Sequence, residues 1–356
     1  MKTLLAVTAA LALLCLGSLA QADVFNLGTG YTNLETVAVG DPGNAGELSG
    51  AGAGGIGPDR ICGSVAYNYN IGKYEVTAKQ YTDFLNNKAK CDGDPYGLYN
   101  TYMGDPSYYH KGCNIQRSGG DTVANPYIYT VADDWANRPV NMVTYWDACR
   151  FANWLSNGQG NGDTETGAYT LTASGIANNT ITRNDGWNWA VTSEDEWYKA
   201  AYYDPGKAGG AGYWDYPTKS NAAPANQVLG TDPGNSANYY INNFSIGSPY
   251  YRTNVGEFEN SGSAYGTFDQ GGNVWEWNEA VVHSSSRGLR GGSLYSGYDG
   301  IALRASSPDY LNAIGWQDNI GFRVCQVPEP SSIITLAGGL VGLSGIRRRS
   351  RAVANK

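Results

Sequence analysis

The sequence predicts a loop-rich globular domain in which short strands alternate with three short helices. The chain has 356 residues, including 48 Gly and 27 Tyr, while charged residues make up only 16%. Such a chain is too rich in aromatic side chains to be disordered, and its surface is expected to carry amides and phenols. Three capped helix starts separate the strand-like segments, so a mixed fold with long connections is expected.

The N-terminus has the three parts of a secretion signal. Lys2 supplies the positive start, residues 4–19 the apolar run, and Ala20-Gln21-Ala22 the small-x-small cleavage site. An uncleaved membrane anchor is the alternative, but the run is short for a membrane-spanning helix. Residues 1–22 are therefore predicted to be a signal peptide, followed by an N-terminal lead over residues 23–34.

Two strands are expected before the first helix. Residues 35–39 alternate between apolar and polar side chains, which is typical of a strand, and residues 64–74 can form the next one. The segment between them, residues 40–60, is rich in glycine. We expect this segment to be an exposed and mobile loop.

Each predicted helix begins at a Thr or Ser followed three residues later by an acidic residue or Gln, which is the capping-box pattern. The helix starts are Thr77, Thr144 and Ser193. The second helix is expected to stop at Asn157-Gly158, and the third to run through Ala201 before Asp204-Pro205.

Two long segments interrupt this pattern. Residues 91–137 are rich in Tyr and Asn and are broken by Asp94-Pro95, Asp105-Pro106 and Asn125-Pro126. They are predicted to be an insertion. Residues 206–264 are expected to be mostly loop.

The stretch over residues 265–277 is the most distinctive part of the chain. Two Trp flank Glu276, Asp269 offers a second carboxylate, and the Gly271-Gly272 pair allows backbone carbonyls to come close. Oxygen ligands of this mixed kind suit calcium. The alternative is a packed loop in which Glu276 makes a structural salt bridge.

Six ordered motifs resemble the formylglycine-generating-enzyme, or sulfatase-modifying factor, family. The strongest is Gly272-Asn-Val-Trp-Glu-Trp277. The others are Ile71-Gly-Lys-Tyr-Glu-Val-Thr77, Arg138-Pro-Val-Asn-Met-Val-Thr144, Thr192-Ser-Glu-Asp-Glu-Trp197, Leu289-Arg-Gly-Gly-Ser293 and Gly321-Phe-Arg323. The resemblance implies an α+β, C-type-lectin-like fold of the formylglycine-generating-enzyme type over residues 35–326, with little regular secondary structure and many loops.

The same resemblance implies a calcium site. Asp269 and Glu276 would give side-chain oxygens, and Gly272 and Val274 would give backbone carbonyls. The members of this ligand set lie within eight residues of one another along the chain.

A second calcium site of the family maps less completely onto this chain. Asn238 and Tyr239 fit its start, but the expected downstream acid corresponds to Ser248 or another neutral residue. Arg290, Arg304 and Arg323 match framework arginines of the family and are expected to bridge buried carboxylates.

Five cysteines remain once Cys15 leaves with the signal, an odd number for an exported protein. The resemblance implies a disulfide between the second helix and the segment after Gly321-Phe-Arg323. A second bridge would close the insertion. The predicted pairs are Cys149 with Cys325 and Cys91 with Cys113, which leaves Cys62 unpaired.

The catalytic residues of the family are missing. Its oxidases resemble one another in a copper(I)-binding cysteine pair after the Arg-Gly-Gly-Ser motif, and thiolates are the ligands that copper(I) requires. Here Ser296 occupies the first position, and no Cys occurs between Cys149 and Cys325. The family's three-histidine iron site cannot be built from His110 and His283 alone. We therefore predict no catalytic residues and expect neither copper nor iron.

The C-terminus carries a second targeting segment over residues 327–351. Pro328-Glu329-Pro330 precedes an apolar stretch from Ile333 to Ile346 and then Arg347-Arg-Arg-Ser-Arg351. This order resembles the PEP-CTERM sorting signal of Gram-negative bacteria. It implies export, transient membrane anchoring and cleavage near Pro-Glu-Pro by an exosortase. A plain C-terminal anchor is the alternative.

The charge balance excludes one class of partner. Without residues 1–22 and 328–356, which hold six of the 24 basic side chains and one of the 32 acidic ones, 18 basic and 31 acidic side chains remain, a net charge of −13. Such a surface repels nucleic acid and anionic lipids. No nucleic-acid partner is expected.

Two classes of function remain. The first is a non-catalytic binding or matrix protein, sorted to the bacterial cell surface or extracellular matrix, whose partner is an extracellular polysaccharide or a surface protein. Aromatic rings stack on sugar faces and amides bond hydroxyls, so the composition suits the polysaccharide. The second class is an oxidase of the family with altered chemistry. The missing thiol pair favours the first class.

Overall fold

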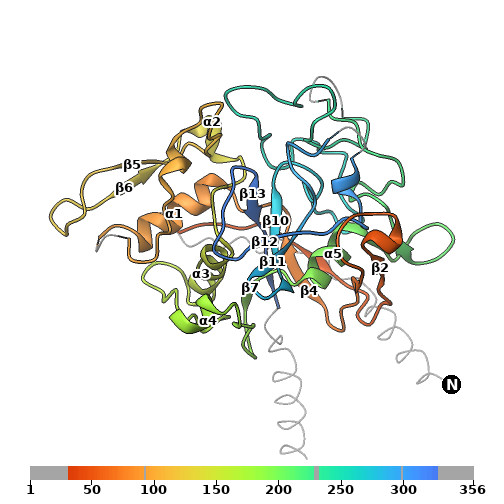
Figure 1. The fold of residues 1–356 in the computed structure, drawn as a ribbon, viewed down its shortest axis with the longest axis horizontal. Coiled ribbons are helices and arrows are strands. Elements are labelled where there is room, and N and C mark those ends of the chain that lie inside the picture. The colour runs from red at the N-terminus through yellow and green to blue at the C-terminus, as the bar shows by residue number, and fades with distance from the viewer. Residues whose placement is uncertain (1–30, 92–93, 228–231, 298–299, 328–356) are drawn as a thin grey trace, which may run out of the picture.

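The computed structural model describes residues 31–91, 94–227, 232–297 and 300–327. Short helices and strands joined by long loops make up these residues (Figure 1). The predicted signal peptide, most of the N-terminal lead and the sorting segment from Pro328 onward lie outside the described residues.

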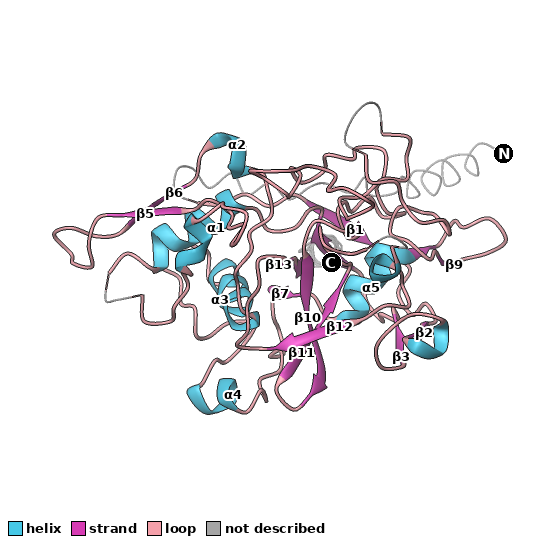
Figure 2. Ribbon diagram, turned by 45° about the horizontal axis from the view of Figure 1, so that its top comes forward, coloured by secondary structure: helices cyan, strands magenta, loops and turns pink. Residues whose placement is uncertain are grey.

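Two four-stranded sheets form the centre of the fold. The first has the order β1-β4-β14-β7, and its strands are Thr36–Val39, Tyr69–Gly72, Val324–Gln326 and Trp189–Val191. The second has the order β12-β11-β10-β13, with strands Asp309–Asn312, Ser286–Arg290, Trp275–His283 and Ile320–Phe322. The pair β10–β13 is parallel and the other neighbours are antiparallel. Figure 2 shows the second sheet between α1 and α3 on one side and α5 on the other.

The three predicted helices are confirmed. They are α1 Ala78–Lys88, α3 Tyr145–Ser156 and α5 Glu194–Tyr202. In each, the Thr or Ser before the first residue accepts a backbone N–H bond and the side chain three residues on completes the capping box. Two shorter helices, α2 Asp133–Ala136 and α4 Ala173–Ala177, were not expected from the sequence.

The Gly-rich segment differs from its prediction. Residues 40–60 are not only loop, because they include β2 Glu47–Ser49, the 3-10 turn Ala51–Ala53 and the start of β3 Arg60–Cys62. Gly50 has a φ of 122°, and a Cβ there would lie 2.6 Å from the carbonyl oxygen of Pro58. Glycine is thus needed at this position to bring the two strands into register.

The other expected strands are shorter than predicted or pair locally. Of residues 64–74, only β4 is a strand. The insertion over 91–137 contains a 3-10 turn and a two-stranded hairpin, and a two-residue pair follows α5. These elements are the turn Thr101–Gly104, β5 Gln116–Ser118, β6 Ile128–Thr130, β8 Tyr203–Asp204 and β9 Gly212–Tyr213. A last 3-10 turn spans Ile301–Leu303.

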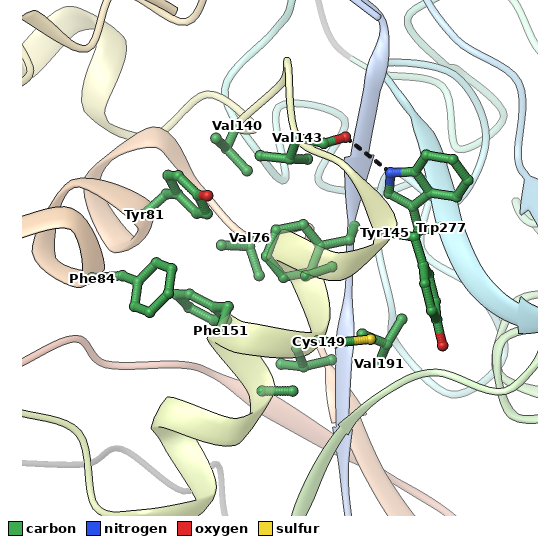
Figure 3. Close-up of a cluster of buried hydrophobic side chains, with 14 of the residues drawn as sticks. Val76, Tyr81, Phe84, Val140, Val143, Tyr145, Cys149, Phe151, Val191 and Trp277 are labelled. Atoms are coloured by element: carbon green, nitrogen blue, oxygen red, sulfur yellow. Dashed lines mark hydrogen bonds between the residues drawn. The ribbon is translucent and has the colours of Figure 1, made fainter. Parts of the chain in front are cut away.

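An aromatic core joins the two large helices to the second sheet (Figure 3). Phe84 of α1 and Phe151 of α3 meet edge to face with ring centroids 5.4 Å apart. Trp277 of β10 is fully buried, and its indole Nε1 donates to the Val143 carbonyl at 3.1 Å. Its ring meets that of Tyr145 edge to face at 6.1 Å. These rings fix where β10 lies against α3.

Buried ion pairs hold the loops around this core. Arg183 Nη2 lies 2.8 Å from Glu196 Oε2, and Arg183 Nε lies 2.8 Å from Glu279 Oε1. Burial acts to raise the pKa of Glu196, but the charge of Arg183 and the hydrogen bonds from Arg183, the Ser193 N–H and Tyr67 together outweigh it and lower that pKa to about 2. Among the described residues, no helix is long and apolar enough to cross a membrane.

Candidate functional site

The second half of the distinctive stretch is a strand. Trp275, Glu276 and Trp277 open β10 and pair with Ile320, Gly321 and Phe322 of β13. The packed loop that was considered as the alternative is therefore a strand at these three residues. Their side chains alternate across an inner strand covered on both faces, which explains why all three are buried.

Glu276 makes a structural salt bridge, which was the alternative to a calcium ligand. Its Oε1 accepts from Arg323 Nη2 at 2.9 Å, and its Oε2 accepts from Arg323 Nε at 3.0 Å. The indole Nε1 of Trp197 donates to the same Oε2 at 2.8 Å. Arg323 also donates to the Gly72 and Phe268 carbonyls, both at 2.8 Å. This fork ties the motif strand to α5, to the end of β4 and to the loop at Phe268.

Two further carboxyl groups lie beside this pair. Glu75 is buried, and its Oε1 has no hydrogen-bond partner. Burial, and then the charges of Asp269 and Glu276, raise the pKa of Glu75 well above its usual range. Asp269 accepts the Gly256 N–H at 2.5 Å, and burial raises its pKa to about 6. Three carboxyl groups thus share one guanidinium, that of Arg323.

Glu75 is the member of this cluster that sequence reasoning missed. It lies in the motif over residues 71–77 that carried the resemblance, but it was not singled out. A signal was present: Glu75 directly precedes Val76, which is buried, and follows β4 by three residues. An acid so close to a buried strand and a helix start needs a buried partner.

The backbone around Gly272 brings the two predicted calcium segments together. Gly272 has a φ of 88°, and a Cβ there would lie 2.3 Å from the Asn238 carbonyl oxygen. The next amide, Asn273 N–H, donates to that oxygen at 2.7 Å. Gly272 is therefore required for the close approach of the 238 loop. Val274 is fully buried beside it.

The second predicted site has no carboxylate. Asn238 Nδ2 donates to the Tyr251 carbonyl at 3.0 Å and to Asn273 Oδ1 at 2.9 Å. The Tyr239 hydroxyl donates to the Pro224 carbonyl. Both side chains thus join loops, and Ser248 supplies no charge.

The oxygen atoms near Asp269 fit a hard cation better than those near Asn238. Asp269 and the unpartnered oxygen of Glu75 are hard donors in a cluster with more negative than positive charge, which is the chemistry that calcium prefers. Asp269 also lines a cavity of about 10 Å³. Across residues 31–91, 94–227, 232–297 and 300–327, no three or more His, Cys, Asp or Glu side chains already form a metal-binding group.

Ser296 is held inside a tight turn. Its Oγ accepts the Ser293 N–H at 2.9 Å, and its own N–H donates to the Ser293 carbonyl at 2.9 Å. A Cβ at Gly292 would lie 2.8 Å from this Oγ. The hydroxyl of Ser296 is thus a structural part of this turn.

The five described cysteines all have free thiols, so the structure forms neither predicted disulfide. Cys149 lies against the Tyr145 hydroxyl, and the Cys325 thiol instead donates to Glu196 Oε2 at 3.3 Å. Cys113 is buried while Cys91 is partly exposed. Cys62 lies 3.3 Å from Arg290 Nη2, and burial raises its pKa to about 12.

The two histidines belong to separate structural features. His110 Nδ1 lies 2.6 Å from Asp105 Oδ2, and its ring stacks on Tyr102 with centroids 4.3 Å apart. His283 ends β10 and contacts the Tyr310 ring. Neither contact provides a histidine-based iron site.

Two of the three framework arginines, Arg290 and Arg323, behave as expected. Arg290 is fully buried, and its Nη2 and Nε bond Glu194 Oε1 at 2.7 and 3.0 Å. Its Nη1 donates to the Ala305 carbonyl at 2.7 Å. Arg304 Nε donates to the Tyr216 hydroxyl at 2.9 Å. Arg290 and Arg323 therefore bridge buried carboxylates to loops, and Arg304 joins a phenol.

Comparison with protein families gives two matches. The model of the sulfatase-modifying factor enzyme 1-like domain matches residues 63–327, and that of the PEP-CTERM protein-sorting motif matches residues 326–349. Both predicted resemblances are confirmed, as is the α+β fold of the formylglycine-generating-enzyme type. No curated protein matches the chain.

Several solved structures resemble this one with low identity. The crystal structure of CarF has a TM-score of 0.47 and 20% identity, and the match covers 83% of this chain and 99% of CarF. Treponema denticola variable protein 1 has a TM-score of 0.46 and 17% identity, and the match covers 85% of this chain and 98% of that protein. PvdO from Pseudomonas aeruginosa has a TM-score of 0.45 and 20% identity, and the match covers 86% of this chain and 98% of PvdO.

Proposed function

Because this chain belongs to the family of the sulfatase-modifying factor enzyme 1-like domain and ends in a PEP-CTERM sorting motif, we propose that it is a non-catalytic binding protein of the cell surface. The sorting motif indicates export toward the surface and processing by an exosortase. The finer proposal is a role in binding extracellular polymer in the matrix of a Gram-negative bacterium.

One observation carries the non-catalytic part of the proposal. The hydroxyl of Ser296 stands in place of the first metal-binding thiol. It stabilises a turn, because it accepts a hydrogen bond from the Ser293 N–H. No cysteine follows in the sequence until Cys325, whose thiol donates to Glu196 in the core. A copper(I) centre needs two soft ligands close together, and this segment supplies none.

The test is an oxidation assay. The copper-treated full chain is incubated in air with a sulfatase-type peptide that contains one cysteine. The mass of the peptide is then measured by mass spectrometry. We expect the peptide mass to match that of a no-protein control. Conversion of the thiol to an aldehyde above that control would contradict the proposal and favour the alternative, an oxidase with altered chemistry.

A matched variant strengthens this assay. Ser296→Cys restores one thiol and is expected to leave the peptide unoxidised, because the second ligand is still absent. Copper(I) binding, measured by competition with a chromogenic chelator, reports on the site independently of turnover. Tight binding by the unmodified chain would count against a non-catalytic domain.

We also propose that calcium binds beside the buried ion pair. Asp269 and Glu75 would supply side-chain oxygens, and the Gly272 and Val274 carbonyls are the backbone candidates. Glu276 is already held by Arg323, so it would act by fixing the guanidinium rather than as a free ligand. Supporting this is the surplus of carboxyl groups around one arginine.

Chelation tests the calcium proposal. A cation that binds only the folded state adds about 2.7 kcal/mol at a hundredfold excess over its Kd. We therefore expect EGTA to lower the melting temperature by several degrees, and Asp269→Ala and Glu75→Gln to abolish that difference. Glu35→Ala, which removes an exposed carboxylate, is the control and should respond like the unmodified chain. Identical melting curves with and without EGTA would rule out the site.

A further inference from the structure

Five large aromatic side chains are exposed on one part of the molecule. They come from the insertion, from the turn that holds Ser296 and from the loop before β13. They are Tyr102, Tyr108, Tyr109, Tyr295 and Trp316, with exposed fractions of 39%, 65%, 85%, 37% and 41%. We call this group the aromatic platform. Exposed rings cost hydration free energy, so their grouping needs an explanation.

Ring contacts join the members of the platform into two groups. Tyr102 and Trp316 have ring centroids 5.4 Å apart, although 214 residues separate them in the sequence. Tyr108 contacts Tyr109 at 5.8 Å. Tyr295 joins this group through the ammonium of Lys111, which lies 5.3 Å from its ring and 4.4 Å from that of Tyr108. The rings thus form two groups, and His110, which stacks on Tyr102 and directly precedes Lys111 in the chain, brings these groups next to each other.

A buried polar framework fixes the platform from below. Asn141 Nδ2 donates to the Lys111 carbonyl at 2.8 Å and to the Asp318 carbonyl at 2.6 Å. Arg252 Nη2 donates to the Gly112 carbonyl at 3.0 Å. Asn141 and Arg252 are both fully buried. They hold the insertion against the loop that carries Trp316, so the rings are positioned before any ligand arrives.

Hydrogen-bonding groups lie among the rings. The Tyr295 hydroxyl donates to Asp318, and Asp105 pairs with His110 under Tyr102. The phenols of Tyr108 and Tyr109 are exposed. A ligand for this surface should therefore offer flat C–H faces together with many hydroxyls.

We propose that the aromatic platform binds an uncharged polysaccharide. This proposal rests on the binding role proposed above and assigns it a ligand class and a place. Pyranose rings present C–H faces that stack on Tyr and Trp, and their hydroxyls bond phenols and carboxylates. The net charge of −13 between the two targeting segments disfavours acidic polymers. Extracellular polysaccharide is also the ligand that a surface-directed protein meets.

A cleft elsewhere on the molecule is the alternative place for such a ligand. A cleft of about 630 Å³ is lined by Tyr31, Tyr74 and several amides, including Asn33, Asn137 and Asn254. The ring of Tyr74 is covered by Gly256 and Phe268, which leaves Tyr31 as its exposed aromatic side chain. Tyr31 is 39% exposed, like Tyr102, and therefore provides a matched control.

The experiment is a depletion assay with the purified full chain. The protein is mixed with insoluble cellulose, cross-linked dextran or chitin as neutral probes and with calcium-alginate beads as the acidic probe, and the unbound protein is measured. We expect binding to at least one neutral probe and none to alginate. Tyr109→Ala/Trp316→Ala should weaken binding about tenfold, because the variant removes two of the rings on which sugar faces would stack. Tyr31→Ala should bind like the unmodified chain.

Controls separate folding from binding. Both ring positions are exposed, so melting curves of the double variant should match those of the unmodified chain. Tyr109→Phe/Trp316→Phe keeps two rings and should retain most of the binding. A loss in this variant equal to that of the alanine variant would overturn stacking as the cause.

Several outcomes would contradict polysaccharide binding by the platform without affecting the proposal that the domain is non-catalytic. These are no depletion by any neutral probe, preferential binding to alginate, or a loss caused by Tyr31→Ala and not by the platform variant. Oxidation of the peptide thiol would instead refute the proposed function while leaving the depletion result unchanged. The two assays therefore fail independently.

Discussion

Arg323→Met is expected to lower the free energy of unfolding by about 3–5 kcal/mol, because it leaves the buried carboxylate of Glu276 without its charge partner. Both side chains of this pair are almost fully buried. The loss also removes bonds to the Gly72 and Phe268 carbonyls and leaves Glu75 and Asp269 without a nearby positive charge. Urea-induced unfolding, followed by tryptophan fluorescence, measures the change.

An exposed ion pair provides the comparison. Lys73→Met breaks the pair with Glu35, whose side chains are 31% and 49% exposed, and should cost less than about 1 kcal/mol. Adding Glu276→Gln to Arg323→Met should recover part of the stability, since the uncompensated charge is then gone. Equal costs for Arg323→Met and Lys73→Met would show that the buried pair does not hold the motif strand.

Trp277→Ala is expected to destabilise the fold by about 3–5 kcal/mol. Trp277 is fully buried on an inner strand, where its ring packs against Tyr145 and its indole donates to the Val143 carbonyl. The substitution leaves a cavity between β10 and α3 and an unpaired carbonyl (Figure 3). Urea unfolding again gives the magnitude.

Trp316→Ala is the matched control for this prediction. Trp316 is also a tryptophan but is 41% exposed, so its loss should change the free energy of unfolding by no more than about 0.5 kcal/mol. If Trp277→Ala and Trp316→Ala had the same free energy of unfolding, the packing of Trp277 in the core of Figure 3 would not stabilise the fold.

Local interactions explain what the sequence determined by itself. The starts of α1, α3 and α5 were predicted because a capping box joins residues three apart, such as Thr77 and Gln80, and needs nothing from the rest of the fold. The stop of α3 at Asn157 is equally local. The family resemblance followed from the residues of the six motifs and from their order along the chain. It led to the correct fold class.

Short strands were harder to predict. β2 and β3 lie in a Gly-rich segment without apolar alternation, and their pairing depends on glycine at position 50, where a side chain would collide with the Pro58 carbonyl. β10 was not predicted as a strand, because Trp275, Glu276 and Trp277 alternate over only three residues, while a strand signal needs about four to eight. Only the neighbouring strands β11 and β13 make it an inner strand.

Tertiary structure alone decided the candidate sites, because their members are distant in the sequence. Glu276 meets an arginine 47 residues away, and Glu75 accepts from Asn273, 198 residues away. Whether a carboxylate binds a cation or an arginine depends on which of them lies within about 3 Å, and spacing along the chain does not fix that distance. The platform likewise exists only because Asn141 and Arg252 hold the insertion against the loop of Trp316.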